Sequence, residues 1–324
     1  MDDQLSEPPH LAWGIIGTGG IASAFAAAIV EHGSSVAGVA SRAVDRAEAF
    51  LDREGIDGLA GTVETLVASK PDAVYVGSSH HNHLDDALAC IEAGIPVLCE
   101  KPLTPDLPTT DRMIDAARSA RVFLMEAMWM RFQPAWILLE RLIADGLIGE
   151  VRTIHADFGI VANDDPRRRW FDPAQAGGSL LDVGIYPVTF AQLVAGPPME
   201  VFSTRTSTET GVDAQYAIAL KHEAGVLSLL GSSFVSDTDL TATVSGSLGR
   251  LHVTAPFHHS SRIEHWKRRE LAGSWEVAYE GSGYVFEVAE VERCLAAGLT
   301  ESPRHPLADT RAVMATLDTL QREG

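Results

Sequence analysis

Hydrophobic and polar positions follow two different patterns along the chain. Up to about residue 125, short apolar runs alternate with stretches of helical period, which is typical of a doubly wound parallel sheet. The predicted strands of this half are 13–16, 35–40, 72–77, 96–99 and 122–125. The predicted helices are 21–32, 43–54, 83–93 and one that begins at Pro105, with Thr104 as its N-cap.

After a predicted helix at 134–144, alternation with a period of two dominates. The β-rich segments are 150–161, 201–209, 214–221, 226–235, 240–246 and 249–254, and helices are predicted near 179–194, 285–297 and 307–322. Strands that follow strands directly predict a mainly antiparallel sheet. The predicted fold class is α/β, with an N-terminal Rossmann half and a C-terminal α+β half built on a large open sheet.

The first predicted strand leads into the sequence Gly17-Thr18-Gly19-Gly20-Ile21-Ala22. The first glycine of such a motif allows a tight turn, and the second lets the backbone approach a pyrophosphate. A small third residue lets the helix pack closely on the strand. Glycine-rich turns also occur without a ligand, but the order of strand, glycines and helix favours dinucleotide binding.

Composition narrows the classes of partner. The chain carries 25 Lys and Arg against 44 Asp and Glu, a formal net charge of −19, which disfavours nucleic acid and anionic membranes. The first residues lack the pattern of a signal peptide, and we expect no apolar run long enough to cross a membrane. A cytoplasmic protein is therefore expected. Cys90, Cys99 and Cys294 have no metal or disulfide spacing and are predicted to be small buried residues.

Three further segments carry chemistry. A buried strand ends in Glu100-Lys101-Pro102, and residues 125–132 lie where the two patterns meet. In the segment 177–187, a helix would place Asp182 and Tyr186 on one face. With the glycine turn, these segments resemble the family of glucose–fructose oxidoreductase, inositol dehydrogenase and the rhizopine-catabolism enzymes, from Leu11 to the last helix.

Within that family, Tyr186 stands where histidine is more usual, which is similar to the branch of dimeric dihydrodiol dehydrogenases, xylose dehydrogenases and glucose–fructose oxidoreductase. The run 169–173 is also similar to that branch. The resemblance implies an NAD(P)-binding Rossmann domain at 11–125 and a substrate-binding and dimerisation domain at 126–324. It implies a homodimer, or a dimer of dimers, through the C-terminal sheet. From composition, only the first ten residues, 1–10, are expected to be flexible.

The implied catalytic residues are Lys101, Tyr186 and Asp182. A free tyrosine, with a pKa of about 10, is a poor base near neutrality, but a nearby lysine ammonium favours its phenolate. Asp182 then either binds a substrate hydroxyl or holds Lys101 in place. The alternative, non-catalytic roles are a surface charge for Lys101, a packing aromatic for Tyr186 and a local cap or ion pair for Asp182.

The resemblance also implies the residues that contact ligands. The cofactor-binding residues are Gly17, Thr18, Gly19, Gly20, Ile21, Ser41, Arg42, Ser79, His80, His83, Glu100, Lys101, Arg169 and Trp170. The substrate-binding residues are Trp129, Arg169, Asp182 and Tyr186. For Trp129, core packing is the alternative, and for Arg169 a solvated loop together with Arg167 and Arg168.

One segment departs from the family pattern, since Ser79-His80-His81-Asn82-His83 replaces a Pro-Asn…His turn. His83 keeps the position of the family histidine by its spacing to Glu100. Because no carboxylate or cysteine completes a ligand set there, no metal site is predicted. His80 is expected to be a neighbour of the cofactor.

The residues at the end of the second predicted strand indicate whether NADP(H) or NAD(H) is preferred. Ser41-Arg42 occupies the place where an NAD-selective site carries Asp or Glu, and an arginine there suits a 2′-phosphate. We therefore expect NADP(H) to be preferred, with NAD(H) possible; a solvated Arg42 is the alternative.

The expected reaction is hydride transfer between this cofactor and a sugar or related cyclic polyol, first of all at C1 of an aldose such as xylose or glucose. A trans-dihydrodiol dehydrogenase or a sugar-carbonyl reductase is the alternative enzyme. A regulator that binds dinucleotide and sugar without turnover is the alternative from another class.

Overall fold

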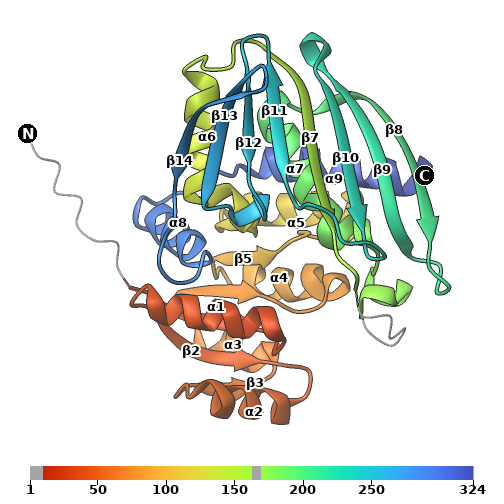
Figure 1. Ribbon diagram of the computed structural model, residues 1–324. Coiled ribbons are helices and arrows are strands. Elements are labelled where there is room, and N and C mark those ends of the chain that lie inside the picture. Colours follow the sequence, from red (N-terminus) through yellow and green to blue (C-terminus); the bar gives the residue numbers. More distant parts are fainter. Residues whose placement is uncertain (1–9, 163–168, 324) are drawn as a thin grey trace, which may run out of the picture. The chain divides into compact units, whose positions relative to one another are not determined.

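The computed structural model describes residues 10–162 and 169–323, and the chain divides into two compact units (Figure 1). Unit 1 comprises Met1–Thr104, Pro108–Trp129 and Gly281–Thr310, and unit 2 comprises Pro105–Leu107, Met130–Glu280 and Arg311–Gly324. Apart from His10, the segment 1–10 that was predicted to be flexible lies outside the described residues, as do Arg167 and Arg168.

Unit 1 is built on a parallel sheet of six strands in the order β3-β2-β1-β4-β5-β6. The strands are β1 (Ala12–Ile16), β2 (Ser35–Ala40), β3 (Leu59–Gly61), β4 (Ala73–Val76), β5 (Val97–Glu100) and β6 (Leu124–Ala127). The helices are α1 (Gly20–Glu31), α2 (Val44–Glu54), α3 (Val63–Ser69), α4 (His83–Glu92), α5 (Leu107–Ala120) and α8 (Val285–Ala296). This strand order is that of the Rossmann fold and confirms the predicted class for this half.

The core of unit 1 explains why its strands are nearly continuous apolar runs. Every residue of β4, β5 and β6 is buried, as expected for a parallel sheet that is covered on both faces. Phe25 of α1 stacks on Tyr75 at a centroid distance of 3.8 Å, and Trp13 packs edge-on against Phe25. Helix α8, from the last part of the chain, packs on α1 and completes this unit (Figure 1).

Unit 2 is built on a sheet of eight strands in the order β14-β13-β12-β11-β7-β10-β9-β8. All neighbouring pairs are antiparallel except β7 with β10, which confirms the predicted mainly antiparallel sheet. The strands are β7 (Val151–Gly159), β8 (Pro198–Ser207), β9 (Asp213–His222), β10 (Leu227–Ser233), β11 (Ala242–Gly246), β12 (Arg250–Val253), β13 (Arg262–Lys267) and β14 (Glu270–Glu276). The helices are α6 (Pro134–Ala144), α7 (Ile185–Ala195) and, mostly in this unit, α9 (Leu307–Glu323).

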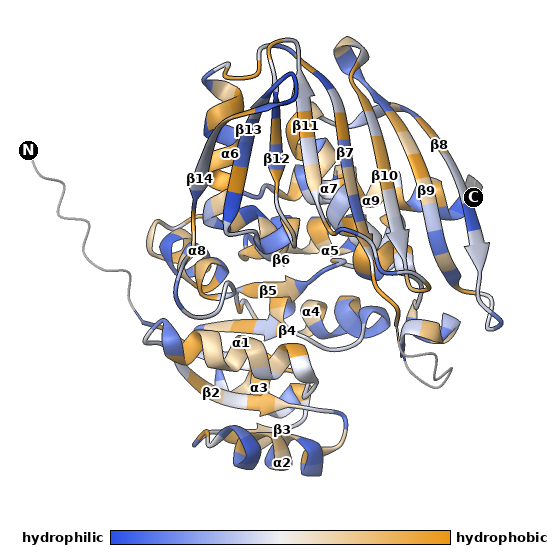
Figure 2. Cartoon of the chain, in the orientation of Figure 1, coloured by the Kyte–Doolittle hydropathy of each residue, from blue (hydrophilic) through white to orange (hydrophobic). Residues whose placement is uncertain are grey.

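One face of this sheet is covered and the other is open. Helix α7 packs against β7 and β10, and α9 reaches the sheet where the Tyr216 hydroxyl donates to the carbonyl of Leu320 at 3.3 Å. Along β10, Ser228 and Leu230 are buried while Leu227 and Leu229 are 48% and 53% exposed. Figure 2 shows hydrophobic and hydrophilic residues interspersed along the strands of this sheet.

Several predicted boundaries were wrong. Helix α5 begins at Leu107 rather than Pro105, so Thr104, three residues earlier, is not at its N-cap position; its buried hydroxyl pairs with that of Thr110 at 2.5 Å. Strand β6 lies two residues later than predicted. The elements β3 and α3, and the hairpin of β13 and β14, were missed; each is at most seven residues long.

The segment Pro173–Ala195 passes the length and apolarity criteria for a membrane span, against our expectation. Because 78% of its most apolar window is buried within the protein, its composition is that of a core helix. The three cysteines are free and buried, as predicted.

A buried carboxyl group in α8 makes the stability of the folded state depend on pH. Glu287 is fully buried, and neither of its carboxyl oxygens has a hydrogen-bond partner among the described residues. Burial, and secondly the charge of Glu100, raise the pKa of Glu287 well above its ordinary value of 4.5. The folded state therefore takes up a proton that the unfolded chain lacks at neutral pH, so stability decreases as pH rises above that ordinary value.

We expect Glu287→Gln, which needs no proton, to raise the midpoint of thermal unfolding at pH 8. A gain of about 2–4 °C corresponds to about 1 kcal/mol in a domain of this size. The gain should vanish near pH 4, where the wild-type carboxyl is protonated in both states. Differential scanning calorimetry across this range is the measurement, with the exposed Glu92→Gln as a control that shows no such trend. A gain that is independent of pH would contradict this account.

Candidate active site

The turn after β1 is wedged against the end of β4. Gly17 has a φ of +118°, and a Cβ on it would lie 2.5 Å from the carbonyl oxygen of Gly77. Hydrogen bonds fix this approach, since the amide of Gly17 donates to Ala40 at 2.9 Å and that of Gly77 donates to Ile16 at 2.8 Å. Only glycine satisfies both the backbone angle and the space at position 17.

The N-terminus of α1 has the features of an anion-binding site. Gly19 is its N-cap and offers no side chain to cap the helix, and the first turn carries no acidic residue. A Cβ on Gly19 or Gly20 would meet no atom within 4 Å, and the φ of Gly19, −79°, suits any residue. The fold therefore does not explain glycine at position 19, whereas close approach of a phosphate does. These residues fit a bound dinucleotide.

The carboxyl ends of the strands meet along one edge of the unit 1 sheet, where ligands bind in folds of this order. Ser41 follows β2, and its amide donates to Gly61 at 3.0 Å. Arg42 is exposed, and its charge acts on Asp86, which accepts a 2.6 Å hydrogen bond from the hydroxyl of Ser78 after β4. Burial raises the pKa of Asp86 and the charge of Arg42 opposes that rise.

Glu100 is a buried anchor at the end of β5. One carboxylate oxygen accepts from the Tyr75 hydroxyl at 2.5 Å, and the other accepts from the amide of Lys101 at 3.1 Å. Burial and the nearby Glu100 carboxylate raise the pKa of Tyr75 well above its ordinary value, so the phenol stays a hydrogen-bond donor. Lys101 thus leaves the sheet from a backbone position fixed by its own neighbour, and a cis peptide joins it to Pro102.

His83 joins two of the loops at this edge. Its ring is fully buried, with Nδ1 at 3.0 Å from the carbonyl oxygen of Pro102 and Nε2 at 3.1 Å from that of Ser78. His80 lies beside it, with ring centroids 5.6 Å apart. Both nitrogens of His83 therefore face backbone carbonyls, which indicates that this histidine positions the loops after β4 and β5.

Trp129, expected at the substrate, has an aromatic partner that the sequence did not indicate. Its ring stacks on Tyr284 at a centroid distance of 4.5 Å. Both residues belong to unit 1 although they lie far apart in the chain, and both are half-buried.

In unit 2, a charged pair lies where the helical segment begins. A guanidinium nitrogen of Arg169 donates to Asp182 at 3.1 Å, and the guanidinium carbon lies 5.9 Å from the ring centroid of Trp170. The Asp182 side chain is 12% exposed and that of Arg169 is 43% exposed. Residues Leu180–Gly184 form a π-helical turn before α7, a feature frequent at functional sites.

A glycine pair holds this arrangement together. A Cβ on Gly177 would lie 2.6 Å from the carbonyl oxygen of Trp170, and the amide of Gly178 donates to that same oxygen at 2.9 Å. Asp213, which the sequence did not indicate, accepts from the amide of Leu180 at 2.7 Å and from the hydroxyl of Ser179 at 2.8 Å. Burial raises the pKa of Asp213, and these two hydrogen bonds oppose that rise.

Tyr186 is buried in an aromatic group at the start of α7. Its ring centroid lies 5.4 Å from that of Phe158 and 5.1 Å from that of His258, and these two rings stack at 4.6 Å. The sequence did not indicate His258 as a site residue. No periodicity links positions 158, 186 and 258, so only the packing of β7, α7 and the loop after β12 brings them together.

Each unit therefore holds part of the predicted set. Gly17, Thr18, Gly19, Gly20, Ile21, Ser41, Arg42, Ser79, His80, His83, Glu100, Lys101 and Trp129 lie in unit 1, and Arg169, Trp170, Asp182 and Tyr186 lie in unit 2. The ligand-binding and catalytic roles of these residues stay predictions.

Comparison with known proteins is consistent with this division. A family model described as an oxidoreductase family with an NAD-binding Rossmann fold matches residues 11–128, and a GFO/IDH/MocA C-terminal domain model matches residues 136–252. The trans-1,2-dihydrobenzene-1,2-diol dehydrogenase of Mus musculus is 34% identical over 96% of both chains.

Among solved structures, a 3-ketoreductase from Actinomadura kijaniata, in complex with NADP and TDP-benzene, is 26% identical. It covers 97% of this chain and 98% of its own, with a TM-score of 0.86. A levoglucosan dehydrogenase in complex with NADH and levoglucosan reaches a TM-score of 0.87 over 97% of both chains at 18% identity, which shows a common fold alone.

The open space over Gly19 generates a prediction. We expect Gly19→Ala to leave the thermal midpoint unchanged but to weaken NADPH binding at least about tenfold, or about 1.4 kcal/mol, because the methyl group occupies space the phosphates need. Gly17→Ala should lower both stability and binding. Calorimetry and fluorescence titration with NADPH distinguish the two variants, and normal NADPH affinity in Gly19→Ala would contradict the assigned phosphate site.

Proposed function

This chain belongs to the glucose–fructose oxidoreductase, inositol dehydrogenase and rhizopine-catabolism (GFO/IDH/MocA) family of oxidoreductases, and from this premise we propose that it transfers hydride between NADP(H) and a cyclic polyhydroxylated substrate. The observation that carries the proposal is the N-terminus of α1, where the N-cap is a glycine and the space over Gly19 and Gly20 is open. It is a site for a dinucleotide, and the buried Asp182 and Tyr186 supply polar groups for a substrate hydroxyl.

The glycine turn and the amides at the start of α1 would hold the pyrophosphate, and Arg42 the 2′-phosphate. When bound, the nicotinamide supplies or accepts the hydride. Glu100 fixes the backbone from which Lys101 extends, and His83 fixes the adjacent loops, so the cofactor edge is ordered before binding.

We assign to Tyr186 the transfer of the hydroxyl proton. In oxidation its phenolate accepts the proton as the substrate hydroxyl becomes a carbonyl, and in reduction its phenol returns it. Lys101 is assigned as the cation that favours the phenolate. Asp182, which accepts a hydrogen bond from Arg169, is assigned to orient a second substrate hydroxyl. An ionised carboxylate only accepts hydrogen bonds, so the hydroxyl would donate to it.

Two substrate classes share the chemistry that this assignment requires. An aldopyranose such as β-xylose or β-glucose carries trans hydroxyls at C1 and C2 of a six-membered ring, and a trans-dihydrodiol carries the same pair on a carbocycle. The resemblance favours oxidation at C1 of an aldopyranose. The curated relatives that are 34% identical favour the trans-dihydrodiol.

Steady-state turnover of the wild type with xylose, glucose and trans-1,2-dihydrobenzene-1,2-diol, each with NADP+ and with NAD+, tests the proposal. We expect turnover with at least one of these ring diols, and a higher kcat/KM with NADP+. A protein that binds NADPH but turns over none of them, and reduces no sugar carbonyl, would instead be a dinucleotide-binding regulator.

Substitutions of the proton-transfer residues test the mechanism. We expect Tyr186→Phe and Lys101→Met each to lower kcat by about 10²–10⁴-fold, since they remove the base and the cation that activates it. The matched control is Tyr216→Phe, which removes a phenol of the same unit that donates to Leu320 and should retain turnover. More than about a tenth of the wild-type kcat in Tyr186→Phe would show that another group moves the proton.

The choice of cofactor rests on Arg42. We expect Arg42→Ala to raise KM for NADP+ at least about tenfold, equivalent to about 1.4 kcal/mol, with little change for NAD+, because it removes the cation assigned to the 2′-phosphate. Arg46→Ala, which removes an exposed arginine of α2, is the control and should change neither value. Equal use of both cofactors by the wild type would refute the preference.

We also propose that the open face of the unit 2 sheet pairs with a second copy of this chain. Register places Phe202, Ala219, Leu229 and His155 in one row across β8, β9, β10 and β7. Phe202 is 61% exposed and Leu229 is 53% exposed, and the row lines a pocket on this face. An apolar row of this kind on a sheet face is typical of a twofold interface.

Multi-angle light scattering at micromolar concentration should give twice the 34.7 kDa of one chain, or a higher even multiple. Leu229→Glu should yield the monomer, because it places a charge at the centre of the row. Leu248→Glu, which alters an exposed leucine outside the row, should not. A wild-type mass of 34.7 kDa would exclude the pairing.

A further inference from the structure

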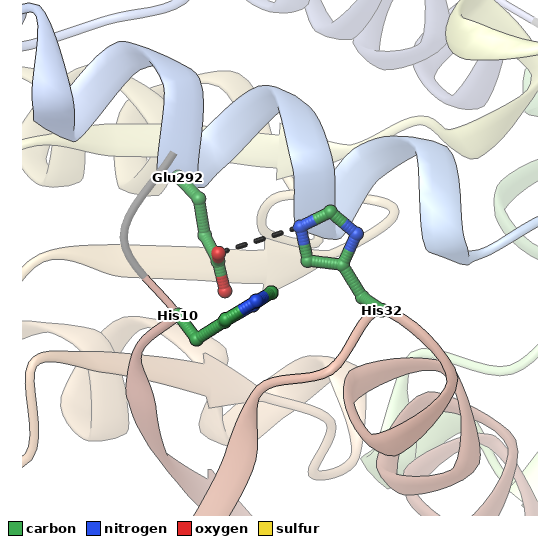
Figure 3. A group of neighbouring side chains, drawn as sticks. All are labelled: His10, His32 and Glu292. Carbon is green, nitrogen blue, oxygen red and sulfur yellow. Dashed lines mark ion pairs between the residues drawn. The ribbon is translucent and has the colours of Figure 1, made fainter. Parts of the chain in front are cut away.

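Three metal-ligating side chains from distant parts of the sequence meet in unit 1 (Figure 3). His10 precedes β1, His32 follows α1, and Glu292 lies in α8. One potential ligand atom from each lies within 4.8 Å of the others. This group is separate from the glycine turn and from the residues assigned to catalysis.

The two carboxylate oxygens of Glu292 differ in their hydrogen bonds. Its side chain is fully buried, and Oε1 accepts from the Trp13 indole at 3.0 Å and from the Ser34 hydroxyl at 2.5 Å. Oε2 is also buried, and neither it nor Nε2 of His32 has a hydrogen-bond partner among residues 10–162 and 169–323. The two hydrogen bonds to Oε1 therefore orient the carboxylate, and within these residues Oε2 has no hydrogen-bond donor.

The spacing of these two atoms matches that of metal ligands. Nε2 of His32 and Oε2 of Glu292 are 3.4 Å apart, longer than the ~2.7–2.9 Å of a charge-assisted hydrogen bond. Two ligands bonded at ~2.0–2.1 Å to a tetrahedral zinc ion lie about 3.4 Å from one another. The pair has the separation of neighbours in a coordination sphere.

His10 supplies a third ligand from the solvent side. Its exposed ring packs edge-on to His32, with centroids 6.0 Å apart, and lies over Gly33. A Cβ on Gly33, whose φ is +93°, would lie 2.9 Å from the His10 ring. The absence of a side chain at Gly33 thus makes the space that His10 occupies in Figure 3.

The end of α1 adds a favourable field. His32 caps this helix, and its amide donates to the carbonyl of Ala28 at 2.9 Å. The carbonyl end of a helix carries partial negative charge and stabilises a nearby cation. Two imidazoles and a carboxylate form a donor set that suits zinc, with the fourth position open to water.

We propose that His10, His32 and Glu292 bind one divalent transition-metal ion, zinc by preference. The ion links the chain before β1, the end of α1 and α8, and so stabilises the packing of the last part of the chain on the N-terminal sheet. Its expected role is structural, because binding to the folded state alone raises stability. The proposal does not depend on the proposed function.

Isothermal titration of tag-free, EDTA-treated protein with ZnCl₂ tests the site, together with thermal unfolding in zinc and the visible absorption of bound Co²⁺. We expect one ion per chain, a higher thermal midpoint in zinc, and a tetrahedral Co²⁺ spectrum. His10→Ala and His32→Ala should each weaken zinc binding by about tenfold or more and abolish the thermal shift. Both leave the Glu292 hydrogen bonds with Trp13 and Ser34 in place.

His81→Ala is the matched control. It removes an exposed histidine of the segment 79–83, outside the proposed site, and should bind zinc like the wild type. Three results would each overturn the proposal. They are a wild type without saturable zinc binding, wild-type affinity in either His10→Ala or His32→Ala, and loss of binding in His81→Ala.

Discussion

The close approach of backbone at the β1–α1 turn is the constraint on which the rest of unit 1 depends. Gly17 lies against Gly77 with no room for a Cβ, and hydrogen bonds tie it to the ends of β1 and β2. Because the strand order reverses between β1 and β4, this contact lies where the carboxyl ends of the central strands meet. It aligns the N-terminus of α1 with Ser41, Ser78 and Lys101 along one edge.

Buried carboxyl groups organise the remainder of this unit. Glu100 is bound by the hydroxyl of Tyr75, and Glu292 by the indole of Trp13. Tyr75 and Trp13 both contact Phe25, so one aromatic group supports a carboxylate beside Lys101 and another in α8. A charged group in a core is stable only when donors compensate for its lost hydration. Glu287 has no such donor in the part of the chain that the structure describes, and burial consequently favours its neutral form.

Unit 2 meets a different requirement, since its sheet has one covered face and one open face. The covered face carries α7, whose preceding π-helical turn holds Asp182 and whose first residues include Tyr186. The glycine pair 177–178 lets the backbone of Arg169 and Trp170 pack against this segment, and Asp213 accepts hydrogen bonds from the amide of Leu180 and the hydroxyl of Ser179. The position of the Arg169–Asp182 pair thus follows from backbone packing.

The sequence by itself determined the class of both halves, since apolar runs and period-two alternation follow directly from burial on two faces or on one. It also indicated the family and the glycine turn, because these depend on residues that are neighbours in the chain. Short elements such as β3 and α3, and the start of α5 at Leu107, are defined only in the structure.

Tertiary structure alone produced the contact of Tyr186 with His258, the hydrogen bond from the Leu180 amide to Asp213, and the group of His10, His32 and Glu292. Their members come from segments separated by tens to hundreds of residues, and no local periodicity records such proximity. The physical reason is that local propensity and patterning act over a few neighbours. Side-chain clusters instead depend on how whole strands and helices pack.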